Sequence, residues 1–155
     1  MNFDAAFDKL IGHEGGLVDD PKDPGGLTKY GVSQRAYPAL DIRSLTLDQA
    51  KAIYLRDYWT KAACDQVPDT IRFDLFDTAV NSGVTQAIKL VQRAVYVTAD
   101  GAIGPNTLTA LKAADPLRTM VRFNANRLAL MVSLANWPTH SRGWVLRVVD
   151  NLLEV

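Results

Sequence analysis

The chain has 155 residues, of which 48% are hydrophobic and 22% are charged. It is long enough for one compact domain, or one with a closely packed C-terminal lobe, and its composition is not that of a disordered chain. Its 17 basic and 17 acidic residues cancel, which argues against a nucleic-acid binder that relies on a basic surface. The single cysteine, Cys64, excludes an intrachain disulfide and is expected to be a small buried hydrophobe.

The sequence shows no targeting or membrane-spanning pattern. No apolar run approaches the ~20 residues that span a bilayer. The N-terminus lacks a basic segment followed by an apolar one. We therefore expect synthesis in a cytoplasm, no export signal and no stable association with a membrane.

The first helix is expected to run from an N-cap at Asn2 to about Glu14. Apolar residues recur at i, i+4, i+7 and i+8 from Phe3, which is typical of one face of an amphipathic helix. Gly15 and Gly16 are expected to end the helix, because glycine adopts the left-handed conformation without steric cost. Glu14 then lies in the last turn, where orphan carbonyls disfavour its ionised form, as a general acid requires.

The glycine-rich segment that follows is expected to form a short, twisted hairpin over residues 17–33. Asp23 lies nine residues after Glu14, and Thr28 follows five residues later. Cleavage of a glycosidic bond needs one protonated carboxyl and a second, ionised group on the other side of the sugar. Glu14 and Asp23 are candidates for this pair, with Thr28 as a supporting hydroxyl.

These assignments have simpler alternatives. A glutamate near a helix end is usually a solvated surface group, and Asp23 before Pro-Gly-Gly is also an ordinary turn residue. Thr28 is also an ordinary strand residue. Asp19 and Asp20 are close enough in sequence to be the second carboxylate instead.

The rest of the chain is expected to be mostly helical. A capping box at residues 46–49 predicts a helix to about residue 60. Further helices are expected at 69–80, 85–96, 105–113 and 116–135, and a last one carries residues 144–152. Helices of this length with one small sheet after the first helix predict a mainly α (α+β) domain.

Three further residues are candidates for substrate binding. Tyr30 and Trp59 are the aromatic residues expected nearest a cleft, although aromatic residues at helical spacing are more often part of a core. Asn81 follows an apolar stretch at the end of its helix. It is either a C-cap or an amide that binds an acetamido group or a water.

Other chemistry is disfavoured. Two scattered histidines and one cysteine lack the spacing of a zinc site, which argues against a metallopeptidase or a zinc amidase. Cys64 as a nucleophile with a histidine is a weak alternative, because a lone cysteine is usually structural. The sequence contains neither GxSxG nor a Walker-type loop. We expect no cofactor and no metal.

Several motifs together resemble the glycoside hydrolase family 108 lysozymes, the phage-type endolysins and their prophage relatives. The matching motifs in the first half are HEGG (13–16), DPGG (23–26), TKYG (28–31), AKAIY (50–54), DYW (57–59) and FDTAVNSG (76–83). From about residue 90 the chain resembles the family's predicted peptidoglycan-binding region, through LVQR (90–93), DGAIGPNTL (100–108) and GWVLRV (143–148). The resemblance covers nearly the whole chain.

The resemblance implies a lysozyme-like catalytic region at 1–89 and a helical peptidoglycan-binding region at 90–155, packed as one compact unit. It implies hydrolysis of the β-1,4 bond between N-acetylmuramic acid and N-acetylglucosamine, with Glu14 as general acid. A neighbouring family of phage lysozymes uses a Glu–Asp–Thr set in which Asp is nine residues after Glu and Thr six after Asp. Asp23 matches that spacing, whereas Thr28 comes one residue early, which reverses its strand face in an otherwise identical hairpin.

The leading hypothesis is therefore an endolysin-type muramidase that causes cell lysis. Glu14 protonates the leaving oxygen, and Asp23 with Thr28 orients a water or stabilises the oxocarbenium-like transition state. Its expected partners are peptidoglycan glycan strands, without nucleic acid, and we expect a monomer. A phage lysis enzyme would be made in the host cytoplasm. It would reach the murein only after a holin opens the inner membrane. The alternative is a non-catalytic peptidoglycan-binding or secretion-associated module.

Overall fold

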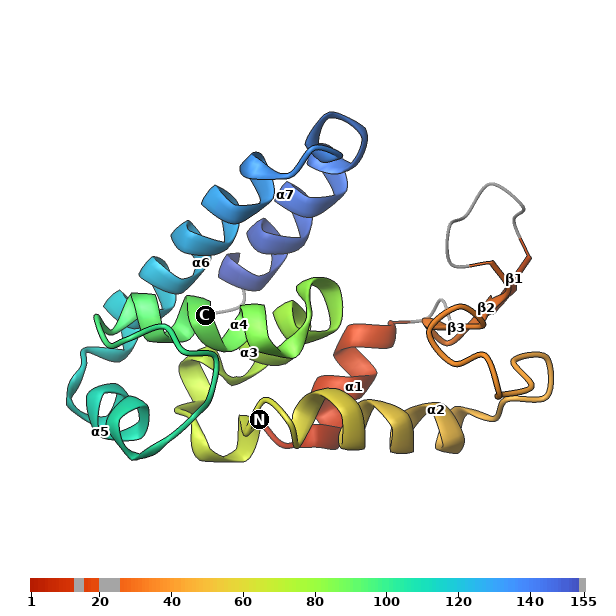
Figure 1. The fold of residues 1–155 in the computed structure, drawn as a ribbon, viewed down its shortest axis with the longest axis horizontal. Helices are drawn as coiled ribbons and strands as arrows, with labels where there is room; N and C mark the ends of the chain where they lie inside the picture. The colour runs from red at the N-terminus through yellow and green to blue at the C-terminus, as the bar shows by residue number, and fades with distance from the viewer. Residues whose placement is uncertain (13–15, 20–25, 154–155) are drawn as a thin grey trace. The chain divides into compact units, whose positions relative to one another are not determined.

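The computed structural model describes residues 1–12, 16–19 and 26–153 (Figure 1). These residues belong to two compact units, Asn2–Asp57 and Met1 with Tyr58–Val155, which we call the N-terminal and C-terminal units. The described part of the chain is mainly α-helical, with one small antiparallel sheet after the first helix. This confirms the predicted fold class. No helix of the described ranges is both long and apolar enough to cross a bilayer.

The first helix, α1 (Phe3–Ile11), begins as predicted and ends earlier. The side chain of Asn2 accepts a hydrogen bond from the backbone N–H of Ala5 at 3.0 Å, which is the expected N-cap. Gly12 follows the helix with φ +59°, and its N–H donates to the carbonyl of Asp8. The prediction that α1 extends to Glu14 is wrong, because Gly12 already ends the helix by adopting a positive φ at no steric cost.

The sheet of the N-terminal unit has three short antiparallel strands in the order β1-β2-β3. They are β1 (Leu17–Val18), β2 (Thr28–Lys29) and β3 (Val32–Ser33). The predicted hairpin over residues 17–33 therefore contains two strand pairings rather than one. Val32 is only 2% exposed, so one face of the sheet is anchored in the core of this unit.

The helix α2 (Leu47–Tyr54) begins at the predicted capping box. The Thr46 hydroxyl accepts from the N–H of Gln49, and the Gln49 side chain accepts in return from the N–H of Thr46. The predicted continuation to about residue 60 is helical, but the α-helix gives way to a π-helix. It forms one π-helical turn, η1 (Leu55–Trp59), which carries the chain from the N-terminal into the C-terminal unit.

The C-terminal unit is all helical in its described part. After a short 3-10 turn, η2 (Cys64–Gln66), its helices are α3 (Asp69–Ser82), α4 (Val84–Ala94), α5 (Pro105–Ala113), α6 (Pro116–Ser133) and α7 (Trp137–Leu153). Helix α3 packs against α4 and α6, and α6 and α7 lie side by side (Figure 1). The predicted helices in this region are confirmed, with boundaries that shift by a few residues.

A buried ionic cluster joins α3 to α6 and α7. The carboxylate of Asp77 is 2% exposed and accepts from Arg127 Nη2 at 2.6 Å and from Arg147 Nε at 2.6 Å. Arg127 is 0% exposed, and its Nε and Nη1 have no hydrogen-bond partner among the described residues. Burial alone would raise the pKa of Asp77, but the two guanidinium groups outweigh burial and lower its pKa.

A second buried carboxylate, Asp74, lies one turn earlier on α3. It accepts from the side-chain amides of Asn124 on α6, at 2.9 Å, and Asn151 on α7, at 2.8 Å. Burial raises the pKa of Asp74 against these two hydrogen bonds. The two aspartates therefore give α3 polar contacts with both α6 and α7.

We predict that Asp77→Asn lowers the free energy of unfolding by about 3–5 kcal/mol, because it leaves Arg127 buried without its counter-charge. Urea denaturation at neutral pH measures the loss. Asp150→Asn is the matched control, since Asp150 is an exposed residue of α7. Equal denaturation midpoints for the two variants would show that the buried ion pair does not hold the helices together.

Candidate active site

The structure describes some of the predicted site residues and not others. Glu14 and Asp23 lie outside the described residues, and their catalytic pairing stays a prediction. Thr28 and Tyr30 come together in the small sheet of the N-terminal unit. Trp59 and Asn81 lie in the C-terminal unit, and we describe them separately below.

The segment that contains Glu14 connects two described elements, α1 and β1. Helix α1 is held against α2 by the edge-to-face contact of Phe7 with Tyr54, whose ring centroids are 5.4 Å apart. An ion pair of 2.9 Å between Asp4 and Lys51 joins the same two helices. The helix that precedes Glu14 is therefore anchored in the core of the N-terminal unit.

The position of Thr28 in the sheet decides which face its side chain occupies. Thr28 pairs with Val18 on β1 and with Ser33 on β3, while its neighbour Lys29 pairs with the buried Val32. Because side chains alternate along a strand, Thr28 lies on the face opposite Val32. Its hydroxyl donates to the carbonyl of Gly26 at 3.0 Å. A hydroxyl that donates keeps lone pairs with which it can accept a hydrogen bond from a water.

The turn between β2 and β3 is formed by Tyr30 and Gly31. Both residues have positive φ, +49° and +73°, as the central residues of a tight hairpin of this type require. The hydroxyl of Tyr54 donates to the carbonyl of Tyr30 at 3.2 Å, and a Cβ at Gly31 would overlap that hydroxyl oxygen. The turn beside Thr28 is thus fastened to α2 through Tyr54.

Asp19 was an alternative for the second carboxylate, and it has a partner in the structure. Its Oδ2 accepts from Arg43 Nη2 at 2.8 Å, and both side chains are more than half exposed. An exposed pair of this kind adds little stability. The choice between Asp19 and Asp23 as the second carboxylate stays a prediction. Asp20 lies outside the described residues.

Trp59 is a core residue of the C-terminal unit. It is 0% exposed, and its ring packs edge-on against Phe76 with centroids 5.3 Å apart. A fully buried indole has no face to offer a sugar ring, so its burial supports the packing alternative rather than the predicted contact with substrate. The aromatic spacing of the helix did not distinguish the two roles.

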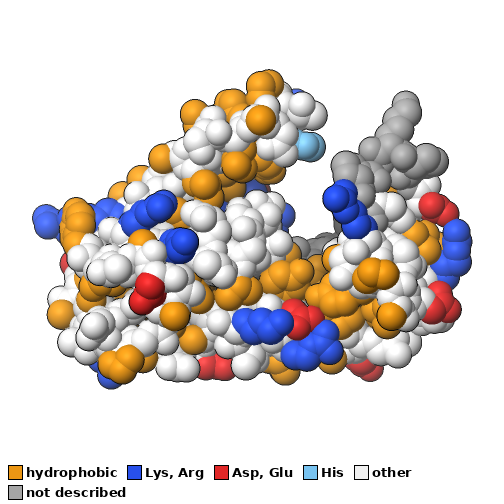
Figure 2. All heavy atoms as spheres, in the orientation of Figure 1, with side chains coloured by type: hydrophobic (Ala, Val, Ile, Leu, Met, Phe, Trp, Pro, Cys, Tyr) orange, Lys and Arg blue, Asp and Glu red, His pale blue; other side chains and the backbone are white. Residues whose placement is uncertain are grey.

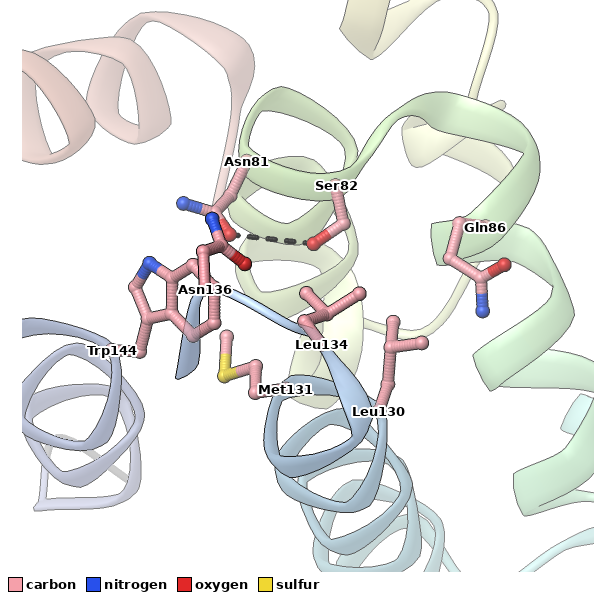
Figure 3. A pocket seen from close by; sticks show the side chains of 8 residues that line it. All are labelled: Asn81, Ser82, Gln86, Leu130, Met131, Leu134, Asn136 and Trp144. Atoms are coloured by element: carbon pink, nitrogen blue, oxygen red, sulfur yellow. Dashed lines mark hydrogen bonds between the residues drawn. The ribbon is translucent and has the colours of Figure 1, made fainter. Parts of the chain in front are cut away.

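Asn81 lies in the last turn of α3 and does not cap it. Gly83 is the C-cap, with φ +88° and an N–H that donates to the carbonyl of Ala79. The Asn81 side chain is instead exposed and lines a pocket of about 370 Å³ (Figure 3). The other residues of this pocket are not among the predicted site residues. They are Ser82, Gln86, Leu130, Met131, Leu134, Asn136 and Trp144.

Thiol and metal chemistry find no support in the described part of the chain. Cys64 is buried, and burial raises the pKa of its thiol to about 12, so the thiol stays protonated at neutral pH. This confirms its expected role as a buried hydrophobe. Within residues 1–12, 16–19 and 26–153, no three His, Cys, Asp or Glu side chains are grouped to hold a metal ion.

Comparisons with known proteins agree with the motifs. Residues 7–83 match the family model described as glycosyl hydrolase 108, and residues 86–149 match the one described as a predicted peptidoglycan domain. Among solved structures, SagA from Brucella abortus is 34% identical, with a TM-score of 0.88 over 96% of this chain and 90% of that chain. No curated protein matches. The predicted division into regions 1–89 and 90–155 stays a prediction.

We predict that Gly31→Ala destabilises the protein more than Gly26→Ala. Both glycines have positive φ, but a Cβ at Gly26 meets no atom of the described residues within 4 Å, whereas a Cβ at Gly31 displaces the Tyr54 hydroxyl. The free energy of unfolding of the control, Gly26→Ala, should therefore fall by only about 1–2 kcal/mol, the cost of a positive φ. That of Gly31→Ala should fall by more. Thermal or urea unfolding measures both.

A double variant separates the two costs at Gly31. The double variant Gly31→Ala with Tyr54→Phe lacks the overlapping oxygen. Its loss in free energy of unfolding should be smaller than the sum of the losses of the two single variants. Strict additivity would mean that the turn is not fastened by Tyr54.

Proposed function

Because this chain belongs to the glycosyl hydrolase 108 family, we propose that it is a muramidase, which hydrolyses the β-1,4 bond between N-acetylmuramic acid and N-acetylglucosamine. The family and the peptidoglycan-domain match make it a glycoside hydrolase that acts on peptidoglycan. The observation that carries the proposal is the glycosyl hydrolase match over residues 7–83, a range that includes Glu14.

In the proposed mechanism, Glu14 donates a proton to the glycosidic oxygen as the bond to the sugar breaks. Asp23, in its ionised form, stabilises the oxocarbenium-like transition state or orients the attacking water. Thr28 supports the second role, because its hydroxyl proton is engaged by the carbonyl of Gly26 and its oxygen remains an acceptor for water.

Tyr30 is the proposed substrate contact of the N-terminal unit. It occupies the turn two residues after Thr28, and its backbone is held by Tyr54. Lys29 Nζ lies 5.5 Å from the centroid of the Tyr30 ring and donates to the carbonyl of Arg43 at 3.0 Å. A ring held in place in this way is preorganised to pack against a sugar.

We further propose that the protein is a monomeric lysis enzyme, made in a host cytoplasm and admitted to the murein by a holin. This proposal rests on the resemblance to phage-type endolysins. Expression in a bacterial cytoplasm tests it: lysis should follow only after the inner membrane is permeabilised with chloroform. Lysis without permeabilisation would contradict the need for a holin.

The bond is tested by digesting purified murein, reducing the products with borohydride and identifying them by mass spectrometry. We expect fragments that end in reduced N-acetylmuramic acid. Glu14→Gln should lower turnover by about 10²–10⁴-fold, since it removes the proton donor, with an unchanged circular dichroism spectrum.

Each other product identifies a different function. Fragments ending in reduced N-acetylglucosamine would indicate a glucosaminidase, and released stem peptides an amidase or a peptidase. Binding to murein without any product would indicate the non-catalytic binding module. Full activity in Glu14→Gln would overturn the role of Glu14.

The second carboxylate is tested by comparing Asp23→Asn with Asp19→Asn on the same murein. We expect Asp23→Asn to lower the rate about 10²-fold or more, because the developing positive charge loses its stabilising carboxylate. Asp19→Asn breaks only the exposed contact with Arg43 and should stay within about twofold of the parent. The reverse order of the two rates would move the role to Asp19.

A further inference from the structure

We propose that the pocket of about 370 Å³ in the C-terminal unit binds one N-acetylated sugar of the murein glycan and recognises its acetamido group. This inference rests on the proposed function, because the ligand belongs to the same glycan strand. The pocket lies where the end of α3 and the start of α4 meet the end of α6 and the start of α7 (Figure 3). We call it the α3–α7 pocket.

The lining residues of the α3–α7 pocket that the structure describes are uncharged and have polar and apolar parts. Its polar groups are three side-chain amides and one hydroxyl, from Asn81, Gln86, Asn136 and Ser82. Its apolar groups are Leu130, Met131, Leu134 and Trp144. In Figure 3, the amides of Asn81 and Asn136 lie near the Trp144 indole, with the Met131 side chain beneath them. Ligand sites of this kind use apolar walls with a few polar groups that fix orientation.

This lining matches the chemistry of an acetamido sugar. The N–H and the carbonyl of the acetamido group need an acceptor and a donor, and a side-chain amide such as Asn81 or Asn136 supplies both. The acetyl methyl needs an apolar surface, which Met131 and Leu134 provide. The partly exposed indole of Trp144 can cover the C–H face of a pyranose ring.

The indole is held in place before any ligand arrives. The ring of His140 stacks on Trp144 with centroids 5.5 Å apart, and Trp137 lies 6.2 Å away. One turn beyond Trp144, Arg147 donates to the buried Asp77 of α3. A side chain fixed in this way loses little entropy on binding, which favours affinity.

Among residues 1–12, 16–19 and 26–153, no charged side chain lines the pocket, which argues for a sugar rather than a stem peptide. A peptide with free carboxylates is normally bound by arginine or lysine. Arg127 and Arg147, which lie on the same two helices as the pocket lining, both donate to Asp77. The peptidoglycan-domain match over residues 86–149 includes six of the eight lining residues, which indicates the polymer from which the sugar comes.

The test is a nuclear magnetic resonance titration of the full chain carrying Glu14→Gln, which prevents cleavage. The probe is the trimer of N-acetylglucosamine, and the comparison probe is the trimer of glucosamine. The chain has three tryptophans, and Trp144→Phe identifies which indole N–H signal belongs to Trp144. We expect the acetylated trimer to shift that signal and the glucosamine trimer to bind at least about tenfold more weakly.

Asn136→Ala, in the same Glu14→Gln background, tests the amide contact. It should raise the dissociation constant read at Trp144 about tenfold, since the ligand loses one hydrogen-bond partner. Asn106→Ala is the matched control, because Asn106 is an exposed residue of α5 outside the pocket. This control should leave the dissociation constant within about twofold of that of the Glu14→Gln protein.

Three results would overturn the proposal: no shift of the Trp144 signal with the acetylated trimer, equal binding of the glucosamine trimer, or a shift caused by a murein stem peptide alone. The product analysis of the parent protein is independent of them. Fragments ending in reduced N-acetylmuramic acid, with an unmoved Trp144 signal, would reject the pocket and keep the muramidase. A shifted Trp144 signal without such fragments would keep the pocket and reject the muramidase.

Discussion

The C-terminal unit depends on one buried charge, the carboxylate of Asp77. Arg127 and Arg147 reach it from α6 and α7, so a single side chain of α3 contacts both helices. Asn81 lies one turn further along α3, and Trp144 lies one turn before Arg147 on α7. The ion pairs that hold α3 against α6 and α7 therefore lie one helical turn from two residues of the α3–α7 pocket.

Much of the fold could be predicted from the sequence, because its signals are local. The capping box at Thr46, the proline at the start of α5 and the aspartate before α6 each act within one helical turn. Even the error in α1 is local, since Gly12 ends the helix before the glycine pair that was expected to do so. A search for the first glycine after the apolar repeat would have found it.

The site was harder to predict, because its contacts join residues far apart in the sequence. Trp59 and Trp144 both lie in predicted helices, yet one is fully buried and the other lines a pocket. Only tertiary packing decides between them. The apolar run around Asp77 did carry a signal, since a carboxylate within a buried stretch of helix requires a partner. That signal indicates a buried ion pair without identifying Arg127, fifty residues later in the chain.

We propose that the enzyme hydrolyses the bond between N-acetylmuramic acid and N-acetylglucosamine and leaves the water oxygen on N-acetylmuramic acid. Isotope labelling tests this proposal most directly. Purified murein is digested in water enriched in ¹⁸O, and tandem mass spectrometry locates the label. The account predicts one ¹⁸O at the new reducing end of N-acetylmuramic acid. Label on N-acetylglucosamine would contradict the assigned bond. Unlabelled anhydro ends would contradict hydrolysis itself.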